Sequence, residues 1–70
     1  MNSDPDYSRI ILAFTYRGFK IEIAKDSFSG QTIYLAWANY DYGSAIAVPY
    51  AMTKNLAIKK AKKWVDVRIG

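Results

Sequence analysis

The sequence predicts an α+β fold in which a three- or four-stranded antiparallel sheet is followed by one carboxy-terminal helix packed on one face (β-β-β-α). Two observations carry this prediction: apolar and polar residues alternate along residues 19–50, and the spacing becomes helical after Thr53. The chain has 70 residues, of which 51% are hydrophobic and 16% aromatic. Such a chain is expected to build one small core and therefore one domain, residues 9–70.

The first elements are the least clearly defined. Residues 1–8 are polar, with one proline and two aspartates, and we expect them to form a flexible leader. Residues 9–17, "RIILAFTYR", form a short apolar run that suits either a strand or a buried helix. Isoleucine, phenylalanine, threonine and tyrosine favour the strand.

Two strands follow with unlike faces. From Gly18 onward, one side carries Phe19, Ile21 and Ile23 and the other carries Lys20, Glu22 and Ala24. Residues 26–31, "DSFSGQ", have the composition of a turn or short loop. The second strand covers residues 32–40, and its two sides are Ile33, Leu35, Trp37 and Tyr34, Ala36, Ala38, Tyr40.

A hairpin is expected to lead into the third strand. Asp41 and Gly43 suit its tight turn, and Pro49 cannot donate to a strand ladder, which favours an edge position. After a capping Thr53, a helix is expected to end near Val67 or Arg68. Its apolar arc contains Ala57, Ile58, Ala61, Trp64 and Val65.

The helix is expected to cover the face with the larger side chains, which are Phe19, Ile21, Ile23, Ile33, Leu35, Trp37, Ile46, Val48 and Tyr50. The opposite, alanine-rich face then becomes a partner-binding surface made of Lys20, Tyr34, Ala36, Ala38, Tyr40, Ala45 and Ala47. The small side chains of this face would allow one of three partners to pack closely on it: the chain's own residues 10–16, a second copy of the chain, or a foreign protein or nucleic acid.

The positive charge is concentrated in the last quarter of the chain. The net charge is +4, yet residues 54–70 hold six basic residues and one acidic residue, a balance of +5. A basic helix face, formed by Lys59, Lys60, Lys62 and Lys63, suits weak and largely non-specific nucleic-acid binding, with the sheet tyrosines stacking bases. A charged outer face also keeps a docked helix in solution, so this function is the alternative.

Residue types for catalysis are scarce. The chain has no cysteine and no histidine, and its serines have no histidine to activate them. We therefore expect no catalytic residues, no metal and no cofactor. With tyrosine not counted, the longest uninterrupted apolar run is Ile10–Phe14, which is too short to span a membrane. The sequence predicts a cytoplasmic, non-catalytic module for protein–protein interaction, most simply self-association as a homodimer.

Overall fold

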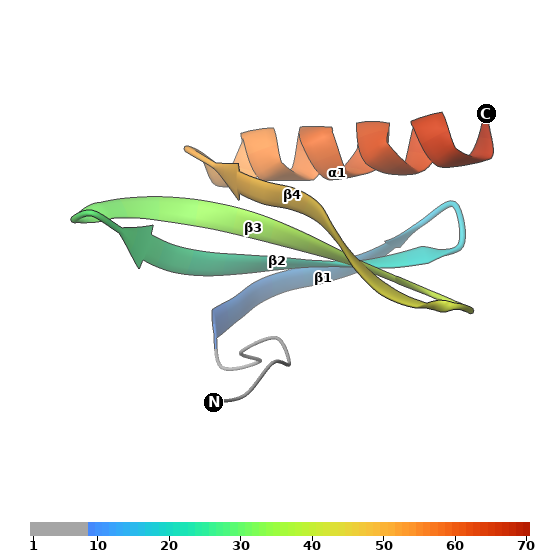
Figure 1. The fold of residues 1–70 in the computed structure, drawn as a ribbon, viewed down its shortest axis with the longest axis horizontal. Helices are drawn as coiled ribbons and strands as arrows, with labels where there is room; N and C mark the ends of the chain where they lie inside the picture. The colour runs from blue at the N-terminus through green and yellow to red at the C-terminus, as the bar shows by residue number, and fades with distance from the viewer. Residues whose placement is uncertain (1–8) are drawn as a thin grey trace.

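The computed structural model describes residues 9–70, which form one antiparallel sheet and one helix. The strands occur in the sheet in chain order, and α1 lies along one side of the twisted sheet next to β4 (Figure 1). This confirms the α+β prediction, with residues 10–16 supplying a fourth strand; the predicted leader, residues 1–8, lies outside the described residues. The elements are β1 (Ile10–Tyr16), β2 (Phe19–Phe28), β3 (Gln31–Tyr40), β4 (Gly43–Ala51) and α1 (Lys54–Ile69).

The first two hairpins turn in two residues each. Arg17 and Gly18 have φ angles of 51° and 90°, and Ser29 and Gly30 have φ angles of 53° and 77°. Two consecutive positive φ angles are the pattern of a type I′ turn, whose twist matches that of the flanking strands. The predicted loop at residues 26–31 is therefore too long, because strand pairing continues through most of it.

Helix α1 begins at the predicted cap. Thr53 is extended, with φ −136° and ψ 156°, and its Oγ1 accepts a hydrogen bond from the Leu56 backbone N–H at 3.1 Å. The completely buried side chains of α1, Ala57, Ala61 and Val65, are small, and the partly buried Ile58 and Trp64 pack beside them. A helix with so narrow a buried stripe is able to lie close to the strands beneath it.

Strand register decides which residues lie under α1. Ile21 of β2 pairs with Ala38 of β3, and Ile23 pairs with Ala36, which in turn pairs with Val48 of β4. Directly paired residues of an antiparallel ladder point to the same face of the sheet. Both β3 alanines are 0% exposed, and they share one buried cluster with the small residues of α1.

The predicted composition of the core is therefore partly wrong. Phe19, Ile21, Ile23 and Val48 do pack with α1, but four other predicted core residues, Ile33, Leu35, Trp37 and Ile46, point to the opposite face. Tyr50 is also exposed. Two features of strand register account for this. The alternation predicted within β3 holds, but β3 joins β2 one residue away from the predicted phase. A register shift between Ala36 and Trp37 in the pairing of β3 with β4 then puts Ile46 and Val48 on opposite faces.

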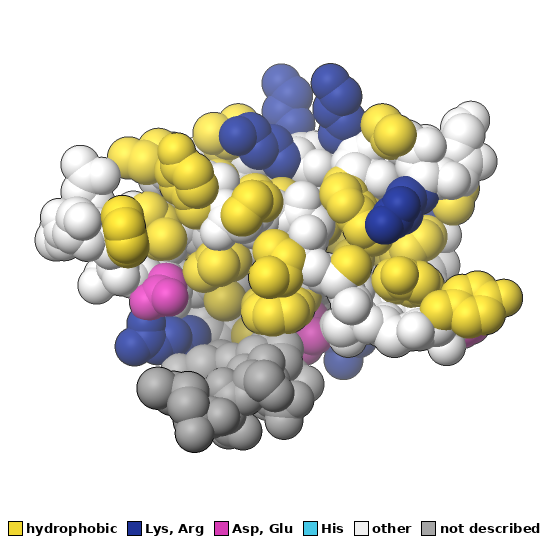
Figure 2. All heavy atoms as spheres, in the orientation of Figure 1, with side chains coloured by type: hydrophobic (Ala, Val, Ile, Leu, Met, Phe, Trp, Pro, Cys, Tyr) yellow, Lys and Arg dark blue, Asp and Glu magenta, His cyan; other side chains and the backbone are white. Residues whose placement is uncertain are grey.

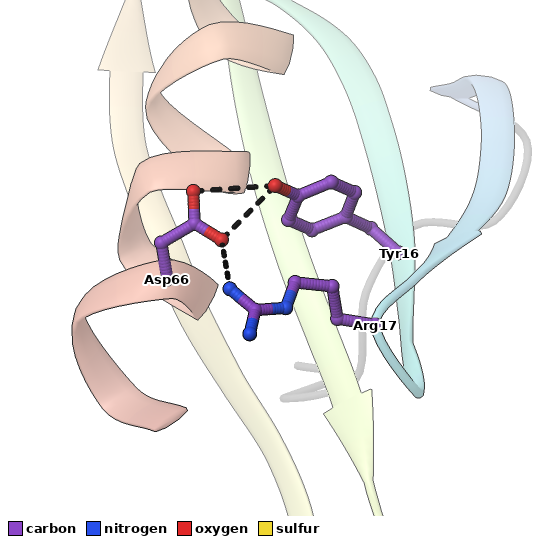
Figure 3. A network of polar contacts seen from close by, with 3 residues as sticks. All are labelled: Tyr16, Arg17 and Asp66. Carbon is purple, nitrogen blue, oxygen red and sulfur yellow. Dashed lines mark hydrogen bonds and ion pairs between the residues drawn. The ribbon is translucent and has the colours of Figure 1, made fainter. Parts of the chain in front are cut away.

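A polar network fastens the carboxy-terminal end of α1 to the first hairpin (Figure 3). The Tyr16 hydroxyl donates to the two carboxylate oxygens of Asp66 at 3.0 and 3.2 Å, and Arg17 Nη1 donates at 2.8 Å. A positive φ costs a residue such as Arg17 about 1–2 kcal/mol. The turn places its guanidinium against Asp66, so the contact offsets part of that strain.

Candidate interaction surfaces

The predicted alanine-rich binding face does not exist as one surface. Ala36 and Ala38 lie under α1, so the close neighbour that their small size allows is the chain's own helix. Residues 10–16, one of the expected occupants, instead form edge strand β1 beside β2. The expectation that this face is open for a partner is wrong.

The other members of that predicted face are divided between the two sides of the sheet. Tyr34 and Tyr40 are half-buried on the helix side, where the Tyr40 ring lies 5.3 Å from that of Phe19. Ala45 and Ala47 are partly buried, with Ala45 in register with Ala38. The remaining member, Lys20, is exposed on the opposite side. The tyrosines are thus occupied by packing, which removes the expected stacking platform for bases.

The face opposite α1 carries the larger apolar side chains. We define the outer sheet face by six residues that share this side and lie outside the buried core cluster: Ala13, Ala24, Ile33, Leu35, Trp37 and Ile46. Ile46 is 51% exposed, and Leu35 and Trp37 are half-buried. Among residues 9–70, no helix or strand packs on this face.

A hollow continues the outer sheet face toward the turn between β2 and β3. Its volume is about 550 Å³, and it is lined by Phe28, Gln31, Ile33, Pro49, Tyr50 and Met52. Figure 2 shows hydrophobic side chains gathered across the middle of the view, over the region where β2, β3 and β4 lie in Figure 1. Phe28, Tyr50 and Met52 are all more than half exposed, so the apolar surface extends beyond the six residues.

The outer sheet face also carries a polar network, which begins beside Trp37 and runs toward the other end of the face. Ser44 Oγ donates to Asn39 Oδ1, and Asn39 Nδ2 donates to Glu22 Oε1 at 2.5 Å, which links β4, β3 and β2. Glu22 is only 8% exposed, and it lies in register with Trp37. This chain of hydrogen bonds depends on strand register, so the sequence alone offered no signal for it.

Three lysines form the basic helix surface, which we define as Lys59, Lys60 and Lys63. All three are exposed: Lys59 and Lys63 lie on the side of α1 turned away from the buried stripe, and Lys60 lies on the flank opposite Lys62. Lys62, predicted as part of the same face, lies on the flank of α1, where its Nζ is 5.4 Å from the centre of the Tyr16 ring. No carboxylate of residues 9–70 forms an ion pair with the three lysines.

The one acidic residue of α1 is occupied. Hydrogen bonds from Arg17 and Tyr16 lower the pKa of Asp66, and donation to Asp66 raises the pKa of the Tyr16 hydroxyl. Asp66 therefore stays ionised near neutral pH, with its charge directed at Arg17. No acidic residue of α1 therefore offsets the positive charge of the basic helix surface.

Neither a metal centre nor a membrane span is found in the described part of the chain. Residues 9–70 contain no group of three histidine, cysteine, aspartate or glutamate residues placed to hold a metal ion. They contain no helix with the length and apolar character needed to cross a membrane. In comparisons with known proteins, no family model, no curated protein and no solved structure matches this chain.

Proposed function

We propose that this chain is a non-catalytic interaction module that self-associates by packing the outer sheet faces of two copies together. The observation that carries the proposal is the apolar character of both sides of β3. Ala36 and Ala38 are buried on one side, while Leu35 and Trp37 lie on the other. A strand that is apolar on both sides is typical of a sheet covered on both faces, and residues 9–70 cover only one.

The size of the face suits a second copy. A strand as long as β3 extends about 33 Å, and four strands span about 19 Å, a footprint of roughly 600 Å². This is near the lower limit for a specific interface, which buries about 800 Å² per partner at standard size.

The chemistry of the face also suits a second copy. Two twisted sheets pack face to face through apolar side chains, and a two-fold axis lets one apolar surface meet itself. We therefore expect a dimer with a Kd in the micromolar range, formed by four layers with the two helices outside. The absence of cysteine is compatible with the reducing cytoplasm, where we place this association.

The test is a charge placed on the apolar part of the outer sheet face, at Ile46 of edge strand β4. Ile46 is exposed and pairs with Trp37, so Ile46→Glu should leave the monomer folded while placing two like charges in the dimer interface. Sedimentation from low micromolar to several hundred micromolar should show a monomer–dimer equilibrium for the wild type. The variant should remain a monomer with an unchanged far-ultraviolet circular dichroism spectrum.

The matched control is Val67→Glu, which makes the same type of change on α1, where Val67 is 74% exposed. This variant should associate like the wild type. A wild-type chain that sediments as a monomer throughout would contradict the proposal, and so would a dimer that Ile46→Glu leaves intact. Either result would mean that a second copy of the chain does not pack on the outer sheet face.

A further inference from the structure

We propose that the basic helix surface binds the phosphate backbone of nucleic acid without reading base sequence. Lys59 and Lys63 are one helical turn apart and Lys60 lies beside them, so the three ammonium groups project from one side of α1. This surface is on the opposite side of the molecule from the outer sheet face. The inference therefore does not depend on self-association.

The charge of this surface is not neutralised within residues 9–70. Asp66 is the single acidic residue of residues 54–70, and its carboxylate accepts from Arg17 and Tyr16 instead of a lysine. The two other cations near the end of α1 are engaged elsewhere: Lys62 lies over aromatic rings of β1, and the Arg68 guanidinium is 4.1 Å from the centre of the Trp64 ring. The three exposed ammonium groups of the basic helix surface thus remain for an anion.

A phosphate backbone fits this surface better than a bilayer does. A helix that lies in a membrane interface inserts a broad apolar face among the lipids. The apolar stripe of α1 is already used, because Ala57, Ala61 and Val65 are completely buried against the sheet. The surface that α1 presents outward carries the lysines, which supports electrostatic contact with a charged polymer rather than insertion.

The type of cation determines what is recognised. An ammonium group acts as a point charge for phosphate, whereas specific reading of guanine usually uses the bidentate guanidinium of arginine. Three phosphate contacts on duplex DNA correspond to a slope of about −3 in a plot of log K against log salt concentration. We expect weak binding, with a Kd of about 10–100 µM at low salt, and equal affinity for unrelated sequences.

The experiment is a salt titration of fluorescence anisotropy with two labelled DNA duplexes of unrelated sequence. The double variant Lys59→Gln/Lys63→Gln should lose two phosphate contacts and change the slope from about −3 to about −1. The control is Lys20→Gln/Lys25→Gln, which removes the same charge from exposed positions of β2. This control should keep the wild-type slope.

Three outcomes would overturn the proposal. The first is no binding to either duplex at low salt, and the second is an equal change of slope in both double variants, which would assign the attraction to net charge. The third is stronger binding to vesicles containing anionic phosphatidylserine than to DNA at the same salt concentration. Ile46→Glu should bind DNA through the same lysines, so failure of self-association and failure of this inference are distinguishable.

Discussion

Replacing Ala36 with leucine is expected to push α1 away from β3. Ala36 is 0% exposed and lies in register with Ile23 on one side and Val48 on the other. The small residues of α1 belong to the same buried cluster, so the site is enclosed by strands on two sides and by the helix above. Three additional carbon atoms at this position have no space unless α1 moves.

The size of the effect follows from this enclosure. Overpacking a core typically costs about 1–3 kcal/mol, and a site closed by backbone on several sides belongs at the upper end of that range. A chain of 70 residues has a total stability of roughly 4–10 kcal/mol. A loss of about 3 kcal/mol should lower the melting temperature of a domain of this size by about 12–24 °C.

Thermal unfolding followed by circular dichroism at one low protein concentration measures this difference. The matched control is Ala13→Leu, also an alanine in a strand, but exposed on the outer sheet face. Its melting temperature should stay within about 4 °C of the wild type. If Ala36→Leu melted within the same narrow range, or if Ala13→Leu were as damaging, α1 would not cover the face assigned to it.

Two further predictions concern the ends of α1. Hydrogen bonds from Arg17 and Tyr16 lower the pKa of Asp66 in the folded chain below its unfolded value, which is near 4. The ionised Asp66 carboxylate therefore stabilises the fold above the unfolded pKa, and this stabilisation is lost as the pH falls through the folded pKa. Urea unfolding of Asp66→Asn should therefore show reduced stability at pH 7 and a shallower decline in acid, and a decline as steep as that of the wild type would contradict this role of Asp66. Thr53→Ala should cost about 0.5–2 kcal/mol in the same assay because the helix cap is lost, and an equal loss in Thr53→Ser would contradict a capping role.

Local patterns were sufficient to predict the elements. A period of two identified β2, β3 and β4, and a period of 3.6 identified α1 together with its buried stripe and its cap at Thr53. The boundary between β2 and β3 was less predictable, because Asp26 and Ser27 are typical turn residues that here continue a strand. Pairing along the whole hairpin outweighs the weak strand preference of these two residues.

The candidate surfaces were predictable to different degrees. The basic helix surface depends mainly on positions within one helix, so the spacing placed Lys59, Lys60 and Lys63 on it. The prediction also included Lys62, which lies over aromatic rings of β1, a contact that helix spacing does not reveal. The outer sheet face depends on how neighbouring strands align, and a slip of one residue exchanges the two sides of a strand. Alternation within β3 separates Trp37 from Ala38, but it does not say which of them lies on the side of Ile21.

The volume of the side chains decides which face of β3 meets the helix. The buried stripe of α1 is made of Ala57, Ala61 and Val65, so its backbone approaches the sheet closely, and only a strand face of similar smallness leaves room for it. Ala36 and Ala38 supply that face. Matching the small residues of α1 to the small residues of β3, rather than to the large apolar ones, would have predicted from the sequence which face of β3 lies under the helix. The same match of small residues leaves Leu35 and Trp37 outside the helix–sheet core. In a domain this small, such large side chains become fully buried only when a second surface packs on the outer sheet face.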